Sequence, residues 1–73
     1  MPLNFPGQMV QSETGFSIRA TDSATRKLVI VKASAEAIQD HGEHRVQQVA
    51  SDKYDSGKIE SDGSILVHAG DCE

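Results

Sequence analysis

The run Leu28-Val29-Ile30-Val31 constrains the fold of this chain more than any other stretch, because it places four large aliphatic residues in succession. Val and Ile branch at Cβ and suit an extended, pleated backbone, so the run predicts a β-strand. A strand that is apolar on both faces typically lies inside a sheet that is covered on at least one side. The sequence therefore predicts a sheet organised around this strand.

The size of the chain limits its hydrophobic core. The 73 residues are the length of one small domain, expected to span residues 1–73. A domain of this size buries only roughly 60% of the surface of its unfolded chain. Apolar residues make up 37% of the chain and aromatic residues 4%. We therefore expect a small core, to which a dimer interface would add buried apolar surface.

The charge balance argues against nucleic acid and anionic membranes as partners. Seven Lys and Arg residues stand against eleven Asp and Glu residues, for a net charge of -4. Binding to a phosphate backbone requires clustered Lys and Arg, and here the basic residues are spread along the chain. A regulator that binds nucleic acid stays as an alternative, because a folded hairpin can gather four basic residues: Arg19, Arg26, Lys27 and Lys32.

Cysteine usage and hydropathy favour a cytoplasmic protein without a membrane partner. The one cysteine, Cys72, has no second thiol with which to form an intramolecular disulfide. Residues 1–10 lack the basic segment and long apolar core of a signal peptide. No stretch approaches the roughly 20 apolar residues of a membrane span.

Alternating hydrophobicity predicts the strands beside the central one. In residues 16–20, apolar and polar side chains alternate with a period of two, which is typical of a half-buried strand. Residues 21–25 have the composition of a turn, so segments 16–20 and 26–33 are expected to form an antiparallel hairpin. Alternation also predicts a last strand over 64–69. A short edge strand is expected at residues 3–5 and a loop over residues 11–14.

Two helices are expected between the hairpin and the last strand. Ser34 suits the N-cap of a short helix over 35–41, and Gly42 suits its end. Residues 43–56 predict a longer amphipathic helix, whose inner face repeats at spacings of three and four: Val46, Val49, Ala50, Lys53 and Tyr54.

These elements predict an α+β fold. The expected architecture is a small antiparallel sheet of three to four strands with two helices packed on one face, in the order (β)-β-β-α-α-β. The pattern leaves open whether Ile59 continues the second helix or begins a strand.

Four short motifs set the layout over most of the chain. Leu3-Asn4-Phe5-Pro6 opens it, and Ala35-Glu36-Ala37-Ile38 begins the first helix. Ala50-x-x-Lys53-Tyr54-x-x-Gly57 ends the second helix, and Asp62-Gly63-Ser64-Ile65-Leu66-Val67 is followed by Asp71. In this layout the chain resembles the small bacterial family of unknown function numbered 1488. The resemblance implies a compact α+β domain in the bacterial cytoplasm and assigns no catalytic residue.

No catalytic or cofactor-binding motif stands out, so the chain is not expected to be an enzyme. His41, Glu43 and His44 have side chains of the types that bind transition metals, but their spacing crosses an expected helix break and fixes no shared face. A small metal-binding protein is therefore an alternative. Cys72 follows His68 by four residues, on a tail expected to be exposed that would hold no general base in place.

The sheet face away from the helices is the expected interaction surface. We expect Leu28 and Ile30 to face the helices together with the apolar residues of segment 16–20. The opposite face would then carry Val29, Val31 and Leu66, an exposed aliphatic patch of the kind that marks an interface.

The resulting prediction is a small protein that acts through protein–protein contacts or homodimerisation. A rival interpretation is that N-terminal side chains cover the patch: Leu3, Phe5, Met9 and Val10.

Overall fold

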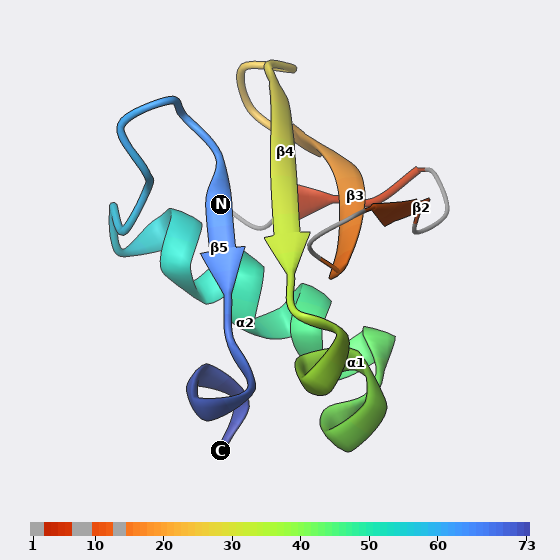
Figure 1. Cartoon of the computed structure of the whole chain (residues 1–73). Helices are drawn as coiled ribbons and strands as arrows, with labels where there is room; N and C mark the ends of the chain where they lie inside the picture. Colours follow the sequence, from red (N-terminus) through yellow and green to blue (C-terminus); the bar gives the residue numbers. More distant parts are fainter. Residues whose placement is uncertain (1–2, 7–9, 13–14) are drawn as a thin grey trace.

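A computed structural model describes residues 3–6, 10–12 and 15–73 (Figure 1). These residues form five strands, two α-helices and a C-terminal 3-10 helix. In chain order the elements are β1 (Leu3–Asn4), β2 (Val10–Ser12), β3 (Gly15–Asp22), β4 (Leu28–Ala33), α1 (Ala35–His41), α2 (Glu43–Asp55), β5 (Ile65–Val67) and η1 (Ala69–Cys72).

The strands form one mixed sheet. β3 and β4 make an antiparallel hairpin, and β1 and β2 pair antiparallel with opposite ends of β3. β5 pairs with β4 on the other side and runs parallel to it. The predicted α+β class with two helices is confirmed. The sheet is mixed instead of antiparallel because both helices lie in the β4–β5 connection, which makes it long enough for a parallel crossover.

The register of the hairpin shows which face of β4 is covered. Ile18 pairs with Val31 and Ala20 with Val29, and these four side chains are buried. The prediction that Leu28 and Ile30 face the helices was wrong, since they lie on the opposite face. The register follows from the turn, in which the backbone N–H of Asp22 donates to the carbonyl of Lys27 at 3.0 Å. A shift of one residue in a strand exchanges its two faces.

The hydrophobic core lies between the covered face and the helices. In Figure 1, α2 passes behind β4 and β5, and α1 lies beyond the end of β4. Val46, Val49 and Ala50 of α2 are buried, which confirms the predicted amphipathic face. The core cluster consists of Leu3, Ile18, Ala20, Val29, Val31, Ala33, Ala37, Val46, Val49, Ala50, Ile65, Val67 and Cys72.

Both helices begin and end close to the predicted residues, because local chemistry fixes their ends. The Ser34 side chain accepts a hydrogen bond from the N–H of Ala37 at 3.1 Å, which caps α1. Gly42 has φ 87° and donates its N–H to the carbonyl of Ile38, so it ends α1 in a conformation that favours glycine.

Gly15 is required where β3 begins. Its φ is +139°, and a Cβ added there would lie 2.4 Å from the carbonyl oxygen of Ala33. This close approach joins the start of β3 to the end of β4, and any side chain would force the two strands apart at that point.

Two other predictions need correction, and the question left open for Ile59 is answered. Residues 10–12 form β2, although Gln11 and Ser12 were expected in a loop, because the edge of β3 supplies partners for their backbone. Ile59 lies in neither a helix nor a strand and is 39% exposed. The C-terminal residues were expected to form an exposed tail, but η1 buries Cys72 against the core. No helix in the described residues is long and apolar enough to cross a membrane.

Candidate functional site

The most distinctive surface of the molecule is the sheet face that the helices leave uncovered, here called the open face. It carries Leu28, Ile30 and Lys32 of β4, with Arg19 of β3 and Leu66 of β5 beside them. Leu28 is 61% exposed, and Ile30 and Leu66 are half-buried. This face is turned toward the viewer in Figure 1. A stripe of aliphatic side chains therefore meets solvent across the two strands.

Of the three predicted interface residues, only Leu66 lies on the open face. Val29 and Val31 are 5% and 0% exposed and belong to the core, so the prediction was wrong for them. The predicted N-terminal cover also fails where it is described. Leu3 and Phe5 pack against the core cluster and Val10 is 62% exposed, while Met9 lies outside the described residues.

Opposite charges flank the aliphatic stripe. Arg19 pairs with Ile30 across the β3–β4 ladder and is exposed. On the β5 side, Asp62 lies with its Oδ2 3.6 Å from the Nζ of Lys32. Asp62 also lines a hollow of about 260 Å³ with Leu28, Ile30, Lys32, Gly63 and Ser64. Ile30 thus lies between a cation and a carboxylate.

Ser64, the residue directly before β5, holds the Asp62 side chain in place. Oδ1 of Asp62 accepts hydrogen bonds from the Ser64 hydroxyl at 2.6 Å and from the Ser64 N–H at 3.0 Å. These two bonds, the hydroxyl first, lower the pKa of the Asp62 carboxyl, with a smaller contribution from Lys32. The carboxylate is therefore a fixed negative charge at neutral pH.

Backbone carbonyls along the outer edge of β5 already accept hydrogen bonds from other residues of the same chain. The carbonyl of Val67 accepts from the N–H of Ser34 on the β4 side, so residues 64, 66 and 68 direct their backbone groups outward. The carbonyl of Ser64 accepts from the N–H of Glu60 at 2.8 Å, and that of Leu66 accepts from the Nζ of Lys53 at 2.8 Å. Because these groups are taken, the β5 edge is a poor template for another strand.

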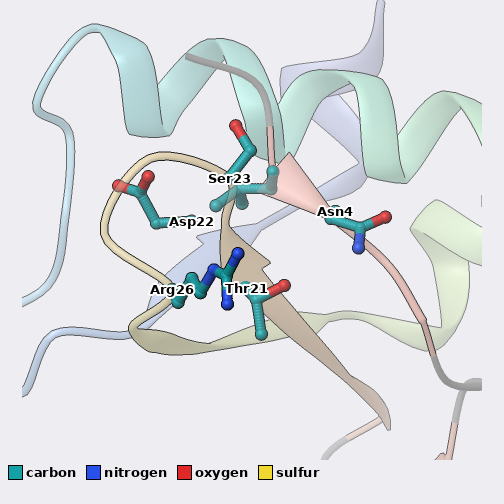
Figure 2. A pocket seen from close by; sticks show the side chains of 6 residues that line it. Asn4, Thr21, Asp22, Ser23 and Arg26 are labelled. Atoms are coloured by element: carbon teal, nitrogen blue, oxygen red, sulfur yellow. The ribbon is translucent and has the colours of Figure 1, made fainter.

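A second surface feature is a hollow of about 580 Å³ at the turn end of the β3–β4 hairpin, here called the hairpin-end pocket. Figure 2 shows the Arg26 guanidinium directed toward Thr21, with Asn4 of β1 beyond it and the Asp22 carboxylate turned away. Arg26 has φ 60°, the left-handed conformation that non-glycine residues rarely adopt. The lining residues are Leu3, Asn4, Thr21, Asp22, Ser23 and Arg26.

Asp22 ties this turn to α2. Its Oδ1 accepts from the N–H groups of Ala24 and Thr25 at 2.7 and 3.1 Å, and its Oδ2 accepts from the Tyr54 hydroxyl. The Tyr54 bond is the largest cause of the lowered pKa of Asp22, followed by the two backbone bonds. The same bond is the largest cause of the raised pKa of Tyr54. The turn is therefore anchored by a charged hydrogen-bond network instead of by apolar packing.

The four basic residues predicted for nucleic-acid binding do not form one group. Arg19 and Lys32 lie on the open face, whereas Arg26 and Lys27 lie at the hairpin turn. Lys32 is also paired with the carboxylate of Asp62, with 3.6 Å between its Nζ and Oδ2 of Asp62. The arrangement lacks the continuous positive surface that phosphate binding requires.

The predicted metal ligands lie on both sides of the helix break. His41 ends α1, and Glu43 and His44 begin α2 after Gly42. In the part of the chain that the structure describes, no three His, Cys, Asp or Glu side chains are placed to hold a metal ion. The structure therefore does not bring these residues together as a site.

Polar contacts hold the C-terminal 3-10 helix against α2. The Nζ of Lys53 lies 2.8 Å from Oδ2 of Asp71, and the Nε of Arg45 donates to the carbonyl of Cys72 at 3.2 Å. Cys72 is 4% exposed and lies in the core cluster, so access to its thiol is restricted.

Comparisons of the chain with protein-family models, curated proteins and solved structures find no match. The resemblance to the bacterial family of unknown function therefore stays a prediction, and the surfaces described above carry the functional argument.

Proposed function

We propose that the protein is a non-catalytic binding protein that acts through protein–protein contact, with a second copy of itself as the partner of the open face. The observation that carries the proposal is the uncovered aliphatic stripe, in which Leu28 is 61% exposed beside Ile30 and Leu66. A small domain gains by burying such a stripe, because each Å² of apolar surface removed from water contributes roughly 25 cal/mol.

Charge placement favours a second copy over an unrelated partner. Arg19 and Asp62 lie on opposite sides of Ile30, toward β3 and β5 respectively. If two open faces pack about a two-fold axis that runs along β4, the β3 side of one copy faces the β5 side of the other. Each Arg19 then meets the Asp62 of the second copy. A two-fold interface must be complementary to itself, and this pair supplies that complementarity.

A dimer interface of standard size would cover a small part of the surface of this chain. A standard interface buries about 800 Å² on each partner, which is about one sixth of the 4763 Å² of accessible surface of this chain. Dimerisation through the β5 edge is disfavoured, since Lys53 and Glu60 occupy its outward carbonyls. The open face is thus the surface that offers both apolar contact and matching charge.

The cytoplasm is the compartment we propose. The lone Cys72 forms no disulfide within the chain and has its thiol in the core, as suits a reducing environment. The bacterial origin of the chain rests on its resemblance to the family of unknown function.

Size-exclusion chromatography with light scattering tests the dimer. A monomer has a mass of 7.9 kDa, so the dimer has twice that, 15.8 kDa. We expect a mass near the dimer value at micromolar concentration and a monomer for Leu28→Glu. The matched control is Ile59→Glu, which places the same charge on an exposed aliphatic residue outside the sheet. A wild-type mass of one monomer over the full concentration range would overturn the proposal.

A further inference from the structure

We infer that the hairpin-end pocket is a binding site for a small organic carboxylate, with the Arg26 guanidinium as its anchor. The binding chemistry of this pocket differs from that of the proposed dimer contact. The pocket would bind through one cation and polar groups, whereas the dimer contact depends on the aliphatic stripe. The pocket volume of about 580 Å³ falls within the roughly 300–1,000 Å³ typical of small-molecule pockets.

The backbone of Arg26 is the first argument. Its φ of 60° places a long side chain in the left-handed region, where a non-glycine residue is strained. The turn itself needs this conformation, because it directs the chain after Arg26 so that the carbonyl of Lys27 accepts from the N–H of Asp22 at 3.0 Å. Glycine would satisfy the turn without strain. The fold therefore does not explain why arginine stands here, and strained residues often mark a functional site.

The free guanidinium is the second argument. Within the described residues, Arg26 forms no ion pair and its side chain donates no hydrogen bond. Figure 2 shows this side chain lying along the pocket toward Thr21, from which the carboxylate of Asp22 is turned away. Three donors already satisfy Asp22, so it offers little competition for the guanidinium.

The lining chemistry selects a carboxylate with a small apolar body. The planar guanidinium fork binds a carboxylate through two parallel N–H donors. The Thr21 hydroxyl and Asn4 amide add further donors across the β1–β3 pair, where these two residues are opposed. Leu3 supplies an apolar wall. Arg26 is the one cation among the described lining residues, which suits a monoanion better than a doubly charged phosphate.

Titration of the ¹⁵N-labelled protein at constant ionic strength, followed by NMR, tests this site. The probes are benzoate, its uncharged counterpart benzamide, and inorganic phosphate. We expect benzoate to cause saturable shifts at the amides of Asn4, Thr21 and Arg26, and benzamide to cause none. Arg26→Gly should weaken benzoate binding by at least about tenfold, the loss expected for charge-assisted hydrogen bonds.

One control variant separates a site from a general charge effect. Lys27→Ser removes a cation beside Arg26 and changes the net charge equally, and it should leave benzoate binding unchanged. Arg26→Gly relieves backbone strain, so an unfolded variant will not account for its loss of binding. The inference is overturned if no probe gives saturable shifts, if phosphate alone does, or if Arg26→Gly binds benzoate as the wild type does.

Discussion

Replacing Val31 by Ala should destabilise the protein far more than replacing Leu28 by Ala, because the two side chains lie on opposite faces of β4. Val31 is fully buried between β3, β5 and the helices, whereas Leu28 is 61% exposed on the open face. The comparison tests the hairpin register from which both the core and the open face follow.

The expected cost comes from the buried methyl groups. Val31→Ala removes two of them, each worth roughly 0.8 kcal/mol of transfer free energy. The cavity left behind adds up to about 1 kcal/mol. The total of about 2 kcal/mol is a large part of the roughly 3–5 kcal/mol that a core of this size supplies. Leu28→Ala in the monomer should cost no more than about 0.5 kcal/mol, as for other exposed sites.

Urea unfolding followed by circular dichroism measures both values. With a slope near 1 kcal/mol/M, the midpoint of Val31→Ala should fall by about 2 M while the slope stays constant. The measurements need a protein concentration at which light scattering shows a monomer, because dimerisation adds to apparent stability. Equal losses for the two variants, or a larger loss for Leu28→Ala, would refute the register and with it the open face.

Three further predictions follow from local chemistry. Gly15→Ala should lower the free energy of unfolding by at least about 2 kcal/mol in the same urea assay, because the new Cβ would lie 2.4 Å from the carbonyl oxygen of Ala33. A loss below about 1 kcal/mol would contradict this expectation. The stability should fall below pH 4, because the pKa of Asp22 is lowered in the folded protein and its carboxylate stabilises the fold only while it is ionised, and it should fall again above pH 10, as the raised pKa of Tyr54 is passed. Tyr54→Phe should weaken the acid dependence and remove the part of the alkaline loss that comes from the tyrosine. Unchanged pH profiles in this variant would refute the Asp22–Tyr54 pair. Iodoacetamide should label Cys72 slowly, because its side chain is buried. Lys53→Met removes the contact of Lys53 with Asp71 of η1 and should speed the labelling at least about fivefold. Rapid labelling of the wild type would contradict the burial of Cys72.

Local signals were sufficient to predict much of the fold. Ser34 and Gly42 fix the ends of α1 through short-range hydrogen bonds, so their roles are visible in the sequence. The spacing of Val46, Val49 and Ala50 likewise reports the buried face of α2. These features depend on residues that are close together in the chain, which is why sequence patterns predict them.

Long-range pairing set the limits of prediction. Leu28, Val29, Ile30 and Val31 are all aliphatic, so hydrophobicity alone does not distinguish their faces, and the turn decides the register. The parallel pairing of β5 depends on the path of the whole crossover.

The candidate site was predicted only in part. Leu66 was identified, but the Lys32–Asp62 pair and the hairpin-end pocket join residues far apart in the sequence. The local anomaly at Arg26, an arginine in a left-handed position, has no sequence signature because glycine or asparagine would be expected there.

Sedimentation equilibrium of charge-swapped variants tests the central claim, that two open faces pair through Arg19 and Asp62. Arg19→Asp alone and Asp62→Arg alone should each weaken self-association, because each places like charges opposite one another. The double variant, or an equimolar mixture of the two single variants, should restore a dimer. Circular dichroism must show that each variant is folded. Association that is unaffected by the single changes, or that the double variant does not restore, would contradict the proposed pairing.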